Sequence, residues 1–172
     1  MNGPIQLVNF KKDSPHLREI LFYWEWKDQF LNIKYEVSPN DNLVWPVSQM
    51  PIRQYEIWKS TCFEFFLSQK DSKSYLEFNL SPSGAWDTYI FSDYRTPSKP
   101  VRFNDVELID FDQTKSSVSA RFKFLDLPFK SAYEANITAV IEDNHGVHYY
   151  AYKHAQTQPD FHHRPSICIE FN

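Results

Sequence analysis

Hydrophobic and polar residues alternate with a period of two along most of this chain. The alternation is clearest in five stretches, which cover residues 31–37, 61–67, 75–81, 118–124 and 135–141. Successive side chains of a β-strand point to opposite faces, so this pattern predicts strands that bury one face in a core. β-branched and aromatic residues fill the apolar positions, which favours the same assignment.

Shorter stretches and turn sequences complete the predicted elements. Six further strands are expected at residues 5–10, 20–26, 86–91, 106–111, 147–152 and 167–171. Pro, Gly, Asn and Asp cluster at 38–41, 81–84 and 143–146, where turns are expected. One short helical turn is expected at 127–133, and the longest irregular segment is 42–57.

The number and spacing of these strands predict the fold class. We expect an all-β protein, an antiparallel β-sandwich of about ten strands, immunoglobulin- or jelly-roll-like, with very little helix. The chain shows no internal repeat and no linker, so residues 1–172 are expected to form a single domain.

Composition narrows the possible functions. Thirty residues are aromatic, which excludes a disordered chain, and the three glycines lie too far apart for a glycine-rich nucleotide loop. The net charge of −4 disfavours nucleic acid as a partner, and no apolar run is long enough to cross a membrane. Without an apolar leader near its start, the chain is expected in the cytoplasm, with Cys62 and Cys168 as buried reduced thiols.

Polar residues occupy the outward-facing positions of two expected neighbouring strands. Glu64 lies on one of these strands, Glu77 and Asn79 lie on the other, and Trp58 and Trp86 are close by in the sequence. Carboxylates and amides beside indole rings suit sugar recognition, since hydroxyls need hydrogen-bond partners and the C–H face of a sugar stacks on a ring. Alternatively, the tryptophans belong to the core and the polar side chains to a wet surface.

Two other kinds of chemistry remain open. His154, Asp160, His162 and His163 in the tail could ligate a metal or supply a catalytic base, or they could be purely structural. Adjacent histidines on an extended chain point in opposite directions, which makes joint ligation difficult. Glu64 and Glu77 could be a glycosidase pair, because that chemistry needs only two facing carboxyl groups.

Three segments of the sequence carry a resemblance to a known family. They are Trp58-Lys-Ser-Thr-Cys-Phe-Glu-Phe-Phe-Leu, the stretch from Tyr75-Leu-Glu-Phe-Asn to Tyr-Ile-Phe91, and the tail from His148-Tyr-Tyr-Ala-Tyr to Phe-His-His163. Together they resemble DOMON-like proteins related to family 9 carbohydrate-binding modules. The resemblance spans Trp58 to Asn172 and implies a β-sandwich with a shallow site on one sheet.

The resemblance also implies roles for particular residues. Trp58 and Glu64 match a stacking tryptophan and a strand glutamate, and Asn79 matches an asparagine that bonds sugar hydroxyls. Glu77 stands where the family carries an arginine, and Arg121 is a second candidate for a family arginine. Tyr150 or Tyr152, with His154, stand near the family's second stacking tryptophan. Other DOMON domains bind haem through Met and His, for which Met50 is the available methionine.

The leading hypothesis is therefore a non-catalytic domain that binds a carbohydrate or small polar metabolite, with no cofactor. Its expected ligand-binding residues are Trp58, Glu64, Glu77, Asn79, Trp86, Arg121, Tyr150 and His154. One alternative is a metal- or haem-binding domain that uses His154, His162 or His163, with Met50 as an axial partner and Asp160 as a further metal ligand. The other alternative is a small glycoside hydrolase that uses Glu64 and Glu77.

Overall fold

The computed structural model describes residues 1–14, 16–47, 49–129, 133–163 and 169–171 of the 172-residue chain. These residues form a nearly all-β protein, as the alternating pattern predicted, and contain no α-helix. The described elements are β1 (Asn2–Asn9), β2 (Glu19–Lys27), β3 (Phe30–Ser38), β4 (Ile52–Arg53), the 3₁₀ turn η1 (Ile57–Lys59), β5 (Cys62–Gln69), β6 (Tyr75–Leu80), β7 (Ala85–Phe91), β8 (Val101–Arg102), β9 (Val106–Gln113), β10 (Ser117–Phe124), β11 (Tyr133–Asp143), β12 (Gly146–Ala151) and β13 (Ile169–Phe171).

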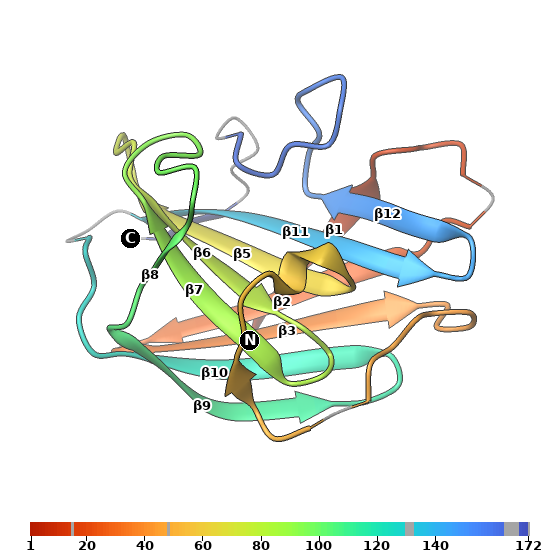
Figure 1. The fold of residues 1–172 in the computed structure, drawn as a ribbon, viewed down its shortest axis with the longest axis horizontal. Helices are drawn as coiled ribbons and strands as arrows, with labels where there is room; N and C mark the ends of the chain where they lie inside the picture. Colours follow the sequence, from red (N-terminus) through yellow and green to blue (C-terminus); the bar gives the residue numbers. More distant parts are fainter. Residues whose placement is uncertain (15, 48, 130–132, 164–168, 172) are drawn as a thin grey trace.

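The strands follow one another in a single curled sheet. Their order is β4-β7-β6-β5-β11-β12-β1-β2-β3-β10-β9, with β8 paired to β7 and β13 paired to β11. β1 joins the two halves, because its start pairs with β2 and its end pairs with β12. The sheet therefore curls over as a half-barrel rather than separating clearly into the closed sandwich that was expected. Figure 1 shows β5, β6, β7 and β11 in one layer and β2, β3, β9 and β10 in the other.

The main core fills the space between these two layers. Phe22 from one half lies with its ring centroid 6.0 Å from that of Phe65, which belongs to the other half. Phe78 and Phe122 make a second such contact at 5.3 Å in an edge-to-face arrangement. All four side chains are buried, so the inward positions of the period-two pattern carry the packing as predicted.

A second, smaller apolar cluster lies on the opposite face of β5, β6 and β7. Its buried members are Phe66, Tyr75, Tyr89 and Phe91, and Trp58 and Phe161 pack against them. Trp58 comes from the segment before β5 and Phe161 from the tail after β12. These irregular segments cover the outer face of the three strands, so β5, β6 and β7 are buried on both faces.

Most of the predicted strands are present within one to three residues of their expected ends. The helical turn expected at 127–133 is wrong for residues 127–129, which are not helical, and residues 130–132 lie outside the described residues. The one 3₁₀ turn in the described part of the chain instead falls at Ile57–Lys59, next to the segment expected to be irregular. β4 and β8 are too short to leave a periodic pattern.

Two sequence expectations concern cysteines and membrane spans. Cys62 is fully buried with a free thiol, whereas Cys168 lies outside the described residues. Over the residues that the structure describes, no helix has the length and apolarity needed to cross a membrane.

Candidate functional site

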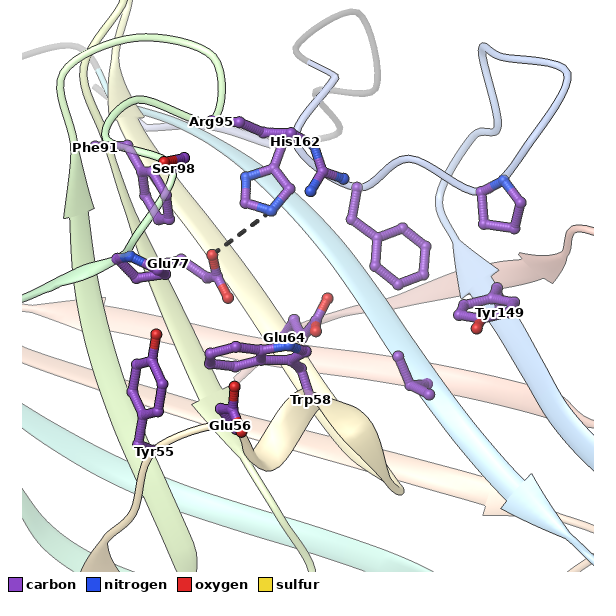
Figure 2. A pocket seen from close by; sticks show the side chains of 14 residues that line it. Tyr55, Glu56, Trp58, Glu64, Glu77, Phe91, Arg95, Ser98, Tyr149 and His162 are labelled. Carbon is purple, nitrogen blue, oxygen red and sulfur yellow. Dashed lines mark ion pairs between the residues drawn. The ribbon is translucent and has the colours of Figure 1, made fainter.

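A cavity of about 470 Å³ opens over the outer face of β5 and β6, within the size range of small-molecule sites. Aromatic and charged side chains from six separate segments line it (Figure 2). The aromatic members are Tyr55, Trp58, Phe91, Tyr149, Phe161 and His162, and the charged members are Glu56, Glu64, Glu77 and Arg95. This composition combines apolar walls with a few convergent polar groups, as is typical of a ligand site.

Strand pairing places Glu64 and Glu77 on the same face of the sheet. Glu64 on β5 lies opposite Asn79 on β6, and Glu77 is two residues from Asn79, so the two glutamates are diagonal neighbours. Thr138 donates a hydrogen bond to Glu64 Oε2 at 2.8 Å, and the Asn79 amide donates to Glu77 Oε1 at 2.6 Å. Each carboxyl group is thus oriented through one of its oxygens. Both glutamates are about 95% buried, with exposed fractions of 4% and 5%.

Burial raises the pKa of both carboxyl groups, because a charge is poorly solvated in this environment. The negative charge of Glu77 raises the pKa of Glu64 further. Hydrogen bonds from Thr138 and Asn79, with the positive charge of Arg95, act in the opposite direction but do not cancel the effect of burial. The pair is therefore expected to retain protons near neutral pH when the cavity holds no ligand.

His162 stands beside Glu77 as a neutral ring. Burial and the nearby charge of Arg95 lower the pKa of His162 to about 4. The Tyr75 hydroxyl accepts a hydrogen bond from the Arg95 backbone N–H and lies 2.7 Å from His162 Nδ1. Nδ1 is the only acceptor for this hydroxyl among the described residues, so Tyr75 donates to it and the proton of the ring resides on Nε2. Nε2 lies 3.8 Å from Glu77 Oε2, drawn as the dashed line in Figure 2.

Asp160 fastens the tail to the loop after β7. Its carboxylate accepts hydrogen bonds from the Tyr94 hydroxyl at 2.7 Å and from the Arg95 guanidinium at 3.1 Å. The backbone N–H of His162 also donates to it, and the pKa of Asp160 is lowered by these donors despite its burial. Asp160 therefore holds the wall of the cavity that carries Phe161 and His162.

Trp58 forms the opposite wall. It lies in the 3₁₀ turn η1, which is anchored by Ile57 in a small buried cluster with Cys62 and Ala85. The indole makes edge-to-face contacts with Tyr55 at 5.3 Å and Tyr89 at 5.6 Å, which fix the plane of its ring. Among the described residues, its N–H has no hydrogen-bond partner. A half-buried indole with a fixed plane and an unused donor can both stack on and hydrogen-bond a ligand.

The cavity brings together three of the eight ligand-binding residues expected from the sequence: Trp58, Glu64 and Glu77. Asn79 lies beneath them, fully buried, where its oxygen accepts from the Cys62 thiol at 3.3 Å while its amide donates to Glu77. It does not line the cavity and acts on the site by orienting Glu77.

The other four expected residues lie elsewhere. Tyr150 was expected to stack on a ligand, but its ring is fully buried in the main core and its hydroxyl accepts from the Arg18 backbone N–H. Trp86 also belongs to the main core, with its ring 5.7 Å from Phe122. In both cases the side chain points to the inner face of the sheet, where no ligand can reach it.

Arg121 and His154 are separated from the cavity by the fold. Arg121 is on β10 in the other half of the sheet, with its guanidinium 4.3 Å from the centre of the Phe30 ring. His154 Nε2 donates to the Val8 carbonyl at 2.9 Å, which ties the tail to β1. Neither residue lines the cavity.

The metal and haem hypotheses find little support in the geometry of these side chains. Within the described parts of the chain, no three His, Cys, Asp or Glu side chains are grouped closely enough to hold a metal ion. Asp160 is occupied by Tyr94 and Arg95, and Met50 is 87% exposed and absent from the cavity lining.

The sequence reasoning missed Tyr55, Phe91, Arg95, Tyr149 and Phe161, all of which line the cavity. Alternation along β12 shows only that Tyr149 and Tyr150 face opposite sides, and the structure shows that Tyr149 is the outward one. Arg95 and Phe161 lie in irregular segments, where no periodicity indicates which face a side chain will join.

Comparisons with known proteins come from structure, since no protein-family model and no curated protein sequence matches this chain. A solved structure from Bacteroides uniformis, provisionally described as a carbohydrate-binding protein, is similar with a TM-score of 0.71 and 15% identity over 95% of this chain and 82% of that chain. Two structures of a family 9 carbohydrate-binding module from Caldicellulosiruptor kristjanssonii, with cellotriose and with glucose, give TM-scores of 0.47 and 0.46 at 12% identity. They cover 81% of this chain and 68% and 69% of theirs. The first likeness shows that this chain shares its fold with the Bacteroides protein.

Proposed function

We propose that this chain is a non-catalytic domain that binds a carbohydrate or a small polar metabolite in the cavity over β5 and β6. The observation that carries the proposal is the placement of two buried carboxyl groups, Glu64 and Glu77, in a cavity walled by Trp58 and Tyr149. Sugars present hydroxyls on their edges and C–H groups on their faces, which fit carboxyl oxygens and aromatic rings respectively.

The shared fold gives independent support. The Bacteroides protein that shares the fold is provisionally described as carbohydrate-binding, and the resemblance seen in the sequence implies the same class of ligand. The DOMON-like part of that resemblance stays a prediction. Trp58 would stack on the sugar, while Glu64, Glu77 and Arg95 would bond its hydroxyls.

Calorimetric titration against a panel of mono- and oligosaccharides tests this proposal. We expect at least one glycan to bind and Trp58→Ala to weaken its binding about five-fold or more, since loss of an aromatic contact costs about 1 kcal/mol or more. Tyr152→Ala is the matched control, because Tyr152 is 46% exposed and does not line the cavity. Absence of binding across the panel, or equal losses in the two variants, would contradict the proposal.

A glycoside hydrolase is the second candidate, and the same two carboxyl groups favour it. Burial raises the pKa of both, which suits a general acid, and two facing carboxyl groups are the minimum that glycoside cleavage requires. Hydrolysis of chromogenic glycosides that disappears in Glu64→Gln would establish this activity. Binding without turnover in the wild-type protein would leave the non-catalytic assignment in place.

A further inference from the structure

Among the described residues, the two central carboxyl groups of the cavity, Glu64 and Glu77, lack a charged partner at ion-pair distance, unlike the other charged side chains around them. Glu56 is paired with Lys59 at 2.6 Å, and Arg95 is paired with Asp160 at 3.1 Å, so each of these charges is offset by a neighbour. Glu64 has no cationic partner in the described part of the chain. The ion-pair contact of Glu77 is with His162 at 3.8 Å, and that ring is neutral above about pH 4.

Both glutamates also have an oxygen without a hydrogen-bond donor. Thr138 donates to Glu64 Oε2 and Asn79 to Glu77 Oε1, which leaves Glu64 Oε1 and Glu77 Oε2 without donors within 3.5 Å among the described residues. Buried carboxyl oxygens without donors are costly, so these two atoms are poised for a ligand that supplies hydrogens. Figure 2 shows both carboxyl groups directed into the space between the aromatic walls.

The aromatic walls favour a positive charge in the same space. Trp58, Tyr55, Tyr149, Phe91 and Phe161 surround the two carboxyl groups, and the faces of aromatic rings attract cations. An ammonium group provides three donors, enough for both carboxyl groups, and a positive charge that one ionised carboxylate balances. A neutral hydroxyl provides a single donor and no charge, and an acidic sugar would be repelled.

We infer that the ligand of this cavity is a sugar with a free amino group, whose ammonium lies between Glu64 and Glu77 while its ring stacks on Trp58. The inference rests on the proposed carbohydrate-binding function and names the class of sugar. The charge of Arg95 reaches the two carboxyl groups, and its ion pair with Asp160 at 3.1 Å offsets part of the repulsion that it would exert on an ammonium.

Release of protons is a second expected consequence of an ammonium that binds between Glu64 and Glu77. Within the described part of the chain, the titratable or charged side chains that face the two carboxyl groups are Cys62, Tyr75, Tyr89, Arg95 and His162. Cys62, Tyr75 and Tyr89 all have raised pKa values and stay neutral near pH 7. Protons released when an ammonium binds would therefore come from Glu64 and Glu77.

The test compares glucosamine with glucose, which differ in one substituent, by calorimetry near pH 6.5 in two buffers of different ionisation enthalpy. We expect glucosamine to bind about ten-fold or more tightly than glucose and to release protons on binding. In the variant that combines Glu64→Gln with Glu77→Gln, the preference for glucosamine over glucose and the proton release should both disappear. Glu56→Gln is the matched control, because Glu56 also lines the cavity but is already paired.

The outcomes separate this inference from the proposed function. Equal affinity for glucose and glucosamine in the wild-type protein would overturn the inference and leave carbohydrate binding standing. Preference for glucosamine that survives in the double Gln variant would also overturn it. Failure of both sugars and of the wider glycan panel would instead overturn the proposed function. The comparison of the two sugars in the wild-type protein tests the inference even if the double variant does not fold.

Discussion

The two halves of the curled sheet have the same alternating sequence pattern and bury the same inner face, but only one half also buries its outer face. On β3 and β10 buried and more exposed positions alternate, and the outward side chains include Lys34, Glu36 and Arg121. On β5 and β6 nearly every position is buried, because the segments that carry Trp58 and Phe161 cover the outer face. Inward packing is thus common to both halves, while the covered outer face of one half provides the cavity. Polar residues beneath such a cover are more informative about function than polar residues in solvent.

Matched outward substitutions give the largest expected difference between the halves. Phe66→Ala on β5 should lower the free energy of unfolding by about 3–5 kcal/mol, because the ring is 6% exposed and packs against Tyr75 and His162. Lys34→Ala on β3 should cost about 1 kcal/mol or less, since it removes a surface ion pair with Glu36 and a cation–π contact with Tyr23 at 5.9 Å. Urea denaturation measures both, and a small loss in Phe66→Ala would mean that the outer face is not covered as described.

The sequence predicted inward residues well and the covered face poorly, for a physical reason. Period-two alternation identifies which side chains share a face, and the stretches 61–67 and 75–81 do bury their alternate residues, such as Phe65 and Phe78, in the core. It does not reveal whether the other face meets solvent or an irregular segment, which is why Arg95 and Phe161 were missed. A partial signal was present in composition, because the outward positions of β5 and β6 include aromatic side chains and no lysine or arginine.

Two residues show how the same limit produced errors. Tyr150 was chosen as a stacking residue and its neighbour Tyr149 was not, although only Tyr149 lines the cavity. The pattern along β12 contains too few strongly apolar residues to establish which tyrosine faces inward. Trp86 follows a turn, and a position beside a turn does not by itself indicate an exposed side chain.

Ionisation of buried carboxyl groups should also distinguish the two halves of the sheet, with an effect of intermediate size on the free energy of unfolding. Burial raises the pKa of Glu64 to about 8 and of Glu77 to about 7, above the ordinary value of 4.5. A carboxyl group whose pKa is higher in the folded state stabilises the fold fully at pH values below its unfolded-state pKa. This stabilisation is lost as pH rises through the folded-state pKa. The free energy of unfolding of the ligand-free protein should therefore fall between about pH 6.5 and pH 8.

The matched variants isolate the source of this pH dependence. The pKa of His162 is lowered to about 4 from its ordinary value of 6.5. The titration of His162 therefore changes the free energy of unfolding only below about pH 6.5, outside the range in which the two glutamates are tested. Combining Glu64→Gln with Glu77→Gln should abolish the fall in the free energy of unfolding between about pH 6.5 and pH 8. Urea denaturation at these two pH values measures it. Glu36→Gln in the other half should leave it intact, because Lys34 lowers the pKa of Glu36 and that group is ionised throughout. A fall that persists in the double variant would assign the titration to other groups.

The smallest expected effect concerns Arg121, the expected binding residue that lies in the uncovered half. Its contact with Phe30 is an exposed cation–π interaction, so Arg121→Ala should lower the free energy of unfolding by about 0.5–1 kcal/mol. It should leave glycan affinity unchanged in calorimetry, because the side chain does not line the cavity. Arg95→Ala should weaken binding, since it removes both a cavity residue and a hydrogen bond to Asp160. The opposite result, with binding sensitive to Arg121 and insensitive to Arg95, would place the ligand on the uncovered half and reverse the distinction between the two faces.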